Sequence, residues 1–475
     1  MYKGYDIYSP KSIEMYGKEL ESKTFRDILK TSDMVVKEED YEYLTSTFSK
    51  GSLGQLVEKY HFKYEPNSDR NPDFEEAGVE LKVTPHKHLK SGKLSAKERL
   101  VLNIINYEKI VEEDFETSSF WLKNQLVLLI HYLYENDKDK LDYLIQKVHL
   151  YEFPEKDLKV IKKDWNTIKK KVLEGKAHEL SEGDTNYLGA CTKGASKSSL
   201  RTQPFSEQMA MQRAFSLKSS YMTTLLRKII NEDDMVSFSN REELETQSLE
   251  ELLMEKFKPY IGLTPKEIAK QVNIKYSKNS KHMIPQLISA TLGISGTRLN
   301  QIDEFAKANI EYKTVRLEPN GTPKEHMSFE QIRFDEVYHE TWEDSHLRNR
   351  FIDTKFLFVV FQYNETKSEN ENREPYFRGI KLWNMPEVVL DTKIKEVWEE
   401  IHRLVRDGVT IEYKVRGKNR VEANNFPGKD FNGVSHVRPK ARDGKDKVKL
   451  PDGQMVTKQC YWLDKDFIGK VLKGK

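Results

Sequence analysis

The stretch Asn71-Pro-Asp-Phe-Glu-Glu-Ala-Gly-Val-Glu-Leu-Lys-Val-Thr-Pro85 decides the fold of this chain. Apolar and polar side chains alternate from residue 79 to residue 84, which is the pattern of a strand that buries one face. The strand is expected to bury Val79, Leu81 and Val83 and to present Glu80, Lys82 and Thr84 on its other face. Asp73 lies seven positions before Glu80, so a turn can bring a second carboxylate to the same end.

These side chains suit the hydrolysis of a phosphodiester, which is anionic and needs a cation to neutralise developing charge and to help make hydroxide from water. Asp73 and Glu80 offer the hard oxygen ligands that suit Mg²⁺. Lys82 could orient the attacking water, assist its deprotonation or stabilise the pentavalent phosphorus, and the sequence leaves all three roles open. A solvated sheet face also carries Glu-x-Lys in a chain with 32% charged residues, so the surroundings must decide.

The residues just upstream indicate a helix that carries a third carboxylate. Ser52 and Gln55 have capping-box spacing, which predicts a helix start. A buried stripe is predicted at Leu53, Leu56, Val57 and Tyr60. Glu58 lies beside that stripe, where it could bind a second metal ion, position a water molecule or be an ordinary exposed side chain.

A family resemblance favours the catalytic interpretation. Residues 50–58 (KGSLGQLVE), Asp73-Phe74 and residues 78–82 (GVELK) resemble the MutH-like endonucleases, which share the PD-(D/E)xK nuclease core. Residues 97–109, 115–120, 176–188, 191–196 and 212–222 extend the likeness to the Sau-three-A group of restriction endonucleases, which cut DNA at GATC. This resemblance implies a Mg²⁺-dependent site with catalytic residues Asp73, Glu80, Lys82, Glu58 and Lys123 and with metal ligands Asp73, Glu80, Leu81 and Glu58.

The same resemblance implies residues that contact DNA. The loop Cys191-Thr-Lys-Gly-Ala-Ser196 is similar to one that enters the major groove in MutH-like enzymes, where lysine or arginine can bond guanine O6 and N7. Lys193, Ser196 and, further along, Lys218 are the candidates in this half. A flexible polar loop is the alternative interpretation of residues 191–196.

The pattern of the amino-terminal half occurs a second time. Thr264, Pro265 and Glu267 predict a capped helix at a domain start, and residues 302–315 (IDEFAKANIEYKTV) resemble the first nuclease motif. Glu311 and Lys313 match Glu80 and Lys82 in this alignment. Glu304 takes the place of Asp73 and Ser289 that of Glu58, so residues 304, 311 and 313 are interpreted as a degenerate second site.

The carboxyl-terminal residues complete the second copy. Residues 436–444 (HVRPKARDG) and 460–468 (CYWLDKDFI) resemble the Arg-Pro-Lys loop and the later aromatic segment of MutH-type enzymes. Arg438 and Lys440 are candidate base readers, and Tyr461 is a candidate sensor of the adenine edge, with an ordinary surface role as its alternative.

The predicted fold class is α/β, with two tandem MutH-like restriction-endonuclease folds, each a mixed β-sheet flanked by helices, that form a pseudo-dimer around DNA. The expected domains are a catalytic nuclease domain at residues 1–235, a helical linker at 236–262 and a DNA-binding, allosteric effector domain at 263–475. The resemblance implies a type II restriction endonuclease that cuts double-stranded DNA 5′ of the G of GATC and binds a second GATC copy through its second half. A MutH-like nickase and a DNA-binding regulator with a decayed nuclease core are the alternatives.

Composition agrees with a large enzyme of two or three domains, at 475 residues with a net charge of +2. Two cysteines, Cys191 and Cys460, predict neither a zinc site nor a disulfide scaffold and fit the cytoplasm. No signal peptide and no membrane span is expected. The expected partners are GATC-containing DNA and, genetically, a cognate GATC methyltransferase. The chain is expected to be a monomer able to dimerise on DNA, because two-strand cleavage needs two chains, successive nicks or a competent second half.

Overall fold

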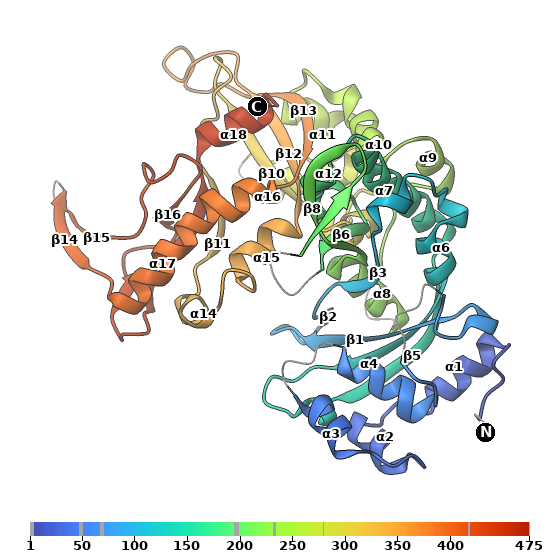
Figure 1. Ribbon diagram of the computed structural model, residues 1–475. Coiled ribbons are helices and arrows are strands. Elements are labelled where there is room, and N and C mark those ends of the chain that lie inside the picture. Colours follow the sequence, from blue (N-terminus) through green and yellow to red (C-terminus); the bar gives the residue numbers. More distant parts are fainter. Residues whose placement is uncertain are drawn as a thin grey trace. The chain divides into compact units, whose positions relative to one another are not determined.

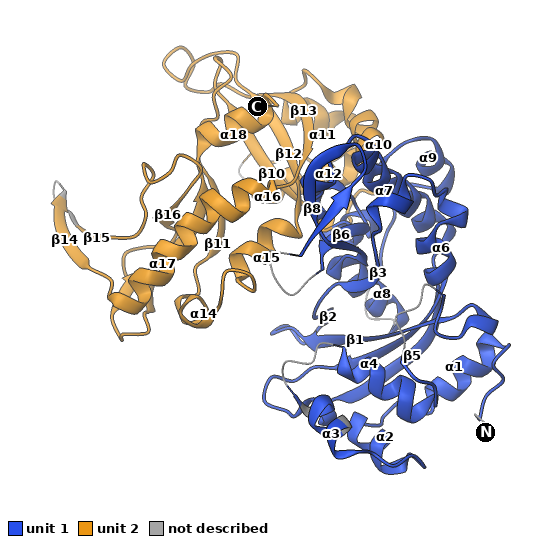
Figure 2. Cartoon of the chain, viewed as in Figure 1, with its two compact units in different colours: residues 1–249, 300–308 blue, residues 250–299, 309–475 orange. Residues whose placement is uncertain are grey.

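The chain forms two compact units in the computed structural model (Figure 2), which describes residues 4–46, 51–66, 71–193, 199–230, 234–278, 280–416 and 419–474. Unit 1 contains residues 1–249 and 300–308, and unit 2 contains residues 250–299 and 309–475. The first boundary therefore lies inside the segment 236–262 that the sequence predicts as a linker. Residues 300–308 differ from the prediction, because they pack with unit 1 rather than with the second half.

Unit 1 contains short helices, one long helix and nine strands among its described residues (Figure 1). Its helices are α1 (Pro10–Lys18), α2 (Phe25–Thr31), α3 (Glu38–Thr45), α4 (Ser52–Leu56), α5 (Tyr107–Ile110), α6 (Ser119–Asn124), α7 (Glu155–Leu173), α8 (Ser219–Ile229), α9 (Arg241–Thr246) and α13 (Asp303–Lys307). Its strands are β1 (Glu80–His88), β2 (Leu94–Ala96), β3 (Leu100–Ile104), β4 (Leu126–Leu133), β5 (Leu144–Glu152), β6 (Leu188–Thr192), β7 (Leu200–Gln203), β8 (Ser206–Met211) and β9 (Arg213–Leu217).

The main sheet of unit 1 has the strand order β2-β1-β4-β5 and is mixed. Strands β1 and β4 are parallel, with Glu80 opposite Val127, whereas the β1–β2 and β4–β5 pairs are antiparallel. The apolar run of β4 is buried, since Leu128 and Ile130 are fully covered within one core cluster. A second, antiparallel sheet has the order β3-β9-β6, and β7 pairs with β8.

Unit 2 repeats this plan. Its helices are α10 (Leu249–Phe257), α11 (Pro265–Gln271), α12 (Met283–Thr291), α14 (Phe334–His339), α15 (His346–Ile352), α16 (Glu387–Val389), α17 (Lys395–Asp407) and α18 (Lys465–Leu472). Its strands are β10 (Ile310–Leu317), β11 (Met327–Gln331), β12 (Lys355–Gln362), β13 (Tyr376–Trp383), β14 (Ile411–Arg416), β15 (Asn419–Asn424), β16 (Ser435–Pro439), β17 (Lys447–Lys449), β18 (Met455–Thr457) and β19 (Gln459–Leu463).

The sheets of unit 2 correspond to those of unit 1 in order and direction. Strands β10 and β12 are parallel and β13 is antiparallel to β12, as in β1-β4-β5. Glu311 lies opposite Phe356, the second residue of β12, just as Glu80 lies opposite the second residue of β4. The sheet β11-β19-β16 is antiparallel and matches β3-β9-β6. The predicted tandem arrangement of two mixed α/β folds is therefore confirmed.

Of the two predicted helix starts, the capping box at Thr264 is confirmed and the capping box at Ser52 is not. Thr264 caps α11, and Glu267 completes the capping box, as predicted. The capping box at Ser52 is wrong, because Gly51 is the N-cap residue of α4 in a left-handed conformation and no side chain caps this helix. The Ser52 hydroxyl instead accepts a hydrogen bond from Lys140 Nζ at 2.9 Å.

The faces of β1 also differ from the prediction. Val79 and Leu81 are buried as expected, but Val83 is half-buried and Thr84 is buried. Glu80 is only 1% exposed, so the second face of this strand is covered rather than solvated.

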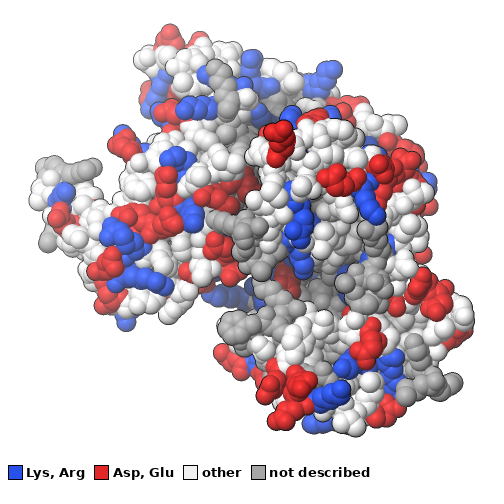
Figure 3. All heavy atoms as spheres, in the orientation of Figure 1, with Lys and Arg blue, Asp and Glu red and all other residues white. Residues whose placement is uncertain are grey.

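Among the described residues, none of the helices combines the length and the apolar character needed to span a bilayer. Lysine and arginine atoms alternate with aspartate and glutamate atoms across the visible face of both units (Figure 3). This mixture agrees with the small net charge of the chain.

Candidate active site

A tight loop before β1 holds two carboxylates together. Phe74 and Val79 form an isolated β-bridge, and Gly78 between them adopts a left-handed conformation with φ 67°. The backbone N–H of Asp73 donates to Glu80 Oε2 at 3.2 Å, and the N–H of Leu81 donates to Asp73 Oδ2 at 2.9 Å. These reciprocal bonds fix both carboxylates at the start of the strand, as the sequence predicts.

Two lysines converge on Glu80. Lys82 projects from the same face of β1 and places its Nζ 2.5 Å from Glu80 Oε1. Lys123 comes from α6, whose N-cap Ser118 accepts from the N–H of Trp121, and its Nζ lies 3.7 Å from Glu80 Oε2. The structure therefore brings Lys123 to the predicted site, although only a short sequence motif indicates it.

Glu58 joins this group from a segment that precedes Asp73 and β1 in the sequence. It lies in a π-helical turn, Val57–His61, that follows α4, and such turns are frequent at functional sites. Burial, reinforced by the neighbouring Asp73 carboxylate, raises the pKa of Glu58 from 4.5 to about 7. Burial also raises the pKa of Glu80, against the effect of Lys82. The charged forms of Glu58 and Glu80 are thus destabilised.

This donor set fits a divalent metal ion. Three carboxylates meet two lysines, so negative charge is in excess where burial makes it costly. A hard cation bound by these oxygens would relieve that cost. Leu81 has no ligand atom in its side chain and could contribute only its carbonyl oxygen. Tyr64 was not predicted from the sequence; its hydroxyl is buried without a hydrogen-bond partner among the described residues, and its ring packs on Phe74.

The matching place in unit 2 is neutralised by ion pairs instead. Lys313 Nζ lies 3.1 Å from Glu311 Oε1, and Arg350 pairs with the same carboxylate. Arg350 also bonds Glu330 at 2.9 Å. Arg350 lies five residues after the N-cap Ser345, as Lys123 does after Ser118, so it is the counterpart of Lys123, which was not predicted from the sequence.

The assignment of Glu304 to the degenerate site is corrected. Glu304 is fully buried in unit 1, where its carboxylate accepts hydrogen bonds from the hydroxyl of Ser239 at 2.6 Å and from Ser237, and pairs with Lys156. Through these hydrogen bonds Glu304 holds residues 237–239 in place, so it does not belong to the site of Glu311 and Lys313. Ser289, the counterpart of Glu58, is buried in α12 and bonds the carbonyl of Gln286.

Three of the candidate DNA contacts are exposed, and two of them lie at equivalent ends of strands. Lys193 follows β6, and its backbone N–H donates to the carbonyl of Gln212, just before β9. Lys440 follows β16, and its backbone N–H donates to the carbonyl of Lys458, just before β19. Arg438 is exposed on β16, with its guanidinium 5.4 Å from the Trp462 ring centroid. Ser196 lies outside the described residues.

Two candidate DNA contacts are corrected because they are buried. Lys218 is 4% exposed, and its Nζ donates to the carbonyl of Thr185 at 2.8 Å. Tyr461 is 5% exposed within the core of unit 2, where burial raises the pKa of its hydroxyl well above the usual value. Neither side chain is available at the surface of its unit to touch a base.

Comparison with known proteins agrees with this architecture. The family described as MutH, DNA mismatch repair enzyme, matches residues 62–164 and 297–393. Over 234 residues the chain is 26% identical to the DNA mismatch repair protein MutH of Actinobacillus pleuropneumoniae serotype 3 (strain JL03). This match covers 47% of this chain and 93% of that protein. The fold and the site together define a MutH-like nuclease, built in tandem.

A longer match identifies the family to which the chain belongs within the MutH-like nucleases. Over 460 residues the chain is 39% identical to the type II restriction enzyme Sau3AI of Staphylococcus aureus, covering 89% of this chain and 92% of that enzyme. The chain belongs to the Sau3AI family of type II restriction enzymes. The prediction of a site-specific endonuclease is thereby confirmed, and the nickase and regulator alternatives have less support, because the MutH relative spans only about half of the chain.

Proposed function

We propose that this protein cleaves both strands of DNA at GATC, 5′ of the G, with Mg²⁺ as its metal ion and with catalysis confined to unit 1. The observation that carries the proposal is the difference between the two copies. Unit 1 has a buried excess of carboxylates, whereas Glu311 in unit 2 is neutralised by Lys313 and Arg350. The former arrangement needs a cation and the latter does not.

In this proposal Asp73, Glu80, Glu58 and the Leu81 carbonyl hold the metal ion. When bound, Mg²⁺ would neutralise charge on the scissile phosphate and lower the pKa of a water ligand. Lys82 lies against Glu80, which holds its ammonium at the start of β1, where it can hydrogen-bond an attacking water or a phosphate oxygen. Lys123 approaches the other oxygen of Glu80 and can stabilise charge on the same phosphate.

Unit 2 is proposed to bind a second GATC copy and to regulate unit 1. Arg438 and Lys440 are exposed on and after β16, as base and phosphate contacts require. Lys193, at the equivalent place in unit 1, is proposed to contact the cleaved site. The genetic partner would be a GATC methyltransferase, the compartment the cytoplasm, and the protein a monomer that dimerises on DNA.

The test is to map the ends of a plasmid that carries two GATC sites after incubation with Mg²⁺. Native protein should break both strands at GATC. Asp73→Ala should leave the plasmid intact, and the matched variant Glu311→Ala should still cut at every site. Intact plasmid with native protein and retained DNA binding would contradict the proposal, as would cleavage that survives Asp73→Ala or stops with Glu311→Ala.

Nicked circles as the final product would favour the MutH-like nickase. The effector role has a separate readout. Arg438→Ala should weaken the gel shift of a GATC duplex and remove the advantage of a two-site plasmid over a one-site plasmid. If both remain unchanged in Arg438→Ala, unit 2 has no such role.

A further inference from the structure

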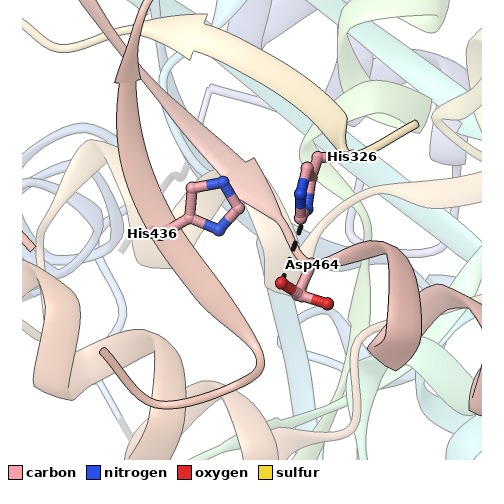
Figure 4. A group of neighbouring side chains, drawn as sticks. All are labelled: His326, His436 and Asp464. Atoms are coloured by element: carbon pink, nitrogen blue, oxygen red, sulfur yellow. Dashed lines mark ion pairs between the residues drawn. The ribbon is translucent and has the colours of Figure 1, made fainter. Parts of the chain in front are cut away.

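Three side chains with metal-binding chemistry meet at one corner of unit 2 (Figure 4). His326 directly precedes β11, His436 lies on β16, and Asp464 is the N-cap residue of α18 just after β19. One ligand atom from each residue lies within 4.8 Å of the others. The corner therefore joins the ends of all three strands of the sheet β11-β19-β16.

The hydrogen bonds at this corner leave the His436 imidazole without a partner among the described residues. Nδ1 of His326 accepts the backbone N–H of Lys465 at 3.2 Å, so it carries a lone pair, yet it also lies 3.4 Å from Oδ2 of Asp464. Two acceptors that face each other repel unless a proton or a metal ion lies between them. His436 is fully buried, and neither of its ring nitrogens has a hydrogen-bond partner among the described residues. An unsatisfied buried imidazole is costly, so a ligand is expected there.

The equivalent corner of unit 1 shows that the fold does not require this group. Arg99 precedes β3, Gly189 is the second residue of β6, and Lys218 follows β9, at the places of His326, His436 and Asp464. Lys218 bonds a backbone carbonyl, and Arg99 pairs with Glu182. The cluster of two histidines and one aspartate is thus particular to unit 2.

We propose that His326, His436 and Asp464 bind a divalent transition-metal ion of the zinc class. Two imidazole nitrogens and one carboxylate oxygen form a ligand set that zinc uses, with a fourth position for water. The side chain of His326 is 16% exposed, which leaves a path for that water. Zinc ligands at about 2.1 Å in tetrahedral geometry lie about 3.4 Å apart. Nδ1 of His326 and Oδ2 of Asp464 already have this spacing, so Nδ1 would exchange its hydrogen bond from Lys465 for the ion, and His436 needs to approach by on the order of 1 Å.

The bound ion would tie the ends of three strands together. Oδ1 of Asp464 caps α18 by accepting the N–H of Asp466 at 2.8 Å, so one carboxylate serves both the helix and the ion. This role is separate from the proposed catalytic site, whose ligands in unit 1 are oxygens.

The test uses Co²⁺ as the probe, with the full chain carrying Asp73→Ala to weaken the oxygen site of unit 1. After chelator treatment, Co²⁺ should bind at one equivalent with the visible d–d absorption of a nitrogen-containing, low-coordinate site, and Zn²⁺ should displace it. Asp464→Asn keeps the helix cap and offers an N–H to His326, so it should fold and bind Co²⁺ at least ten-fold more weakly. His326→Gln should weaken binding similarly.

His339→Gln is the matched control, because His339 is exposed in the same unit and lies outside the cluster. Circular dichroism confirms that each variant is folded, and either cluster variant suffices for the test. Absence of a one-equivalent absorption, or equal Co²⁺ affinity in Asp464→Asn and in the His339→Gln control, would overturn the proposal.

Discussion

Glu58→Gln should stabilise the metal-free protein at alkaline pH while it impairs metal binding. Glu58 is the carboxyl whose pKa is raised to about 7 by burial and by the neighbouring Asp73. Glutamine has the shape of the protonated acid and cannot ionise. The variant therefore removes the cost of a buried charge but also removes a proposed ligand.

The magnitude follows from linkage. Because the folded-state pKa lies above the ordinary value of 4.5, the folded chain binds this proton more tightly than the unfolded chain does. The resulting stability is fully present below pH 4.5 and is lost as the pH rises through 7. A pKa raised from 4.5 to about 7 corresponds to on the order of 3 kcal/mol. For a unit of this size that is up to about 10 °C in Tm.

The assay is thermal unfolding in chelator at pH 5 and pH 8, followed by circular dichroism. The native protein and Glu58→Gln should melt together at pH 5, and the variant should melt higher at pH 8. Added Mg²⁺ should raise the Tm of the native protein more than that of the variant. Glu76→Gln is the matched control, since Glu76 is exposed on the same loop, and it should follow the native protein throughout.

The reasoning is refuted if Glu58→Gln is less stable than the native protein at pH 8 without metal, or if the stability difference does not change between the two pH values. Either result would mean that Glu58 ionises in the folded protein at little cost in free energy. The unit 1 site would then hold no excess of negative charge that a cation needs to neutralise.

Three further outcomes are expected. Lys307→Met should lower the free energy of unfolding by about 3–5 kcal/mol in urea denaturation, because Lys307 is buried and bonds Asp157 and Asp303 at 2.7–2.8 Å. Stability should fall as the pH drops from about 6.5 to about 4, because burial lowers the folded-state pKa of His149 to about 4; His149→Phe should flatten this dependence in pH-dependent melts. Gly78→Ala should cost about 1 kcal/mol and slow plasmid cleavage, whereas Gly78→Asn should do so less, because asparagine tolerates a positive φ better.

The sequence predicts most of the unit 1 site because its residues lie in one loop and one strand. Period-two alternation places Glu80 beside Lys82, and a turn of seven residues suffices to return Asp73. The burial of Glu80 could not be predicted in this way. The neighbours of Glu80 include Lys123 of α6 and Glu58, which come from elsewhere in the chain.

The errors share a physical origin in pairing between distant segments. Lys218 stands in a polar stretch of sequence, but pairing of β9 with β6 carries it to the carbonyl of Thr185 in the interior. Tyr461 belongs to the central strand β19, and its side chain packs in the core cluster of unit 2 on one face of that sheet. Glu304 could be aligned with Asp73 by spacing alone, whereas its serine partners become visible only in three dimensions.

The return of residues 300–308 to unit 1 makes the two halves of the polypeptide interdependent. The chain leaves unit 1 at residue 249, builds three helices of unit 2, and comes back to deliver Glu304 and Lys307 before continuing. A fragment that stops at residue 249 would leave Asp157 and Lys156 without these buried partners. The complete fold of unit 1 therefore depends on a segment that the polypeptide supplies only after α10, α11 and α12 of unit 2.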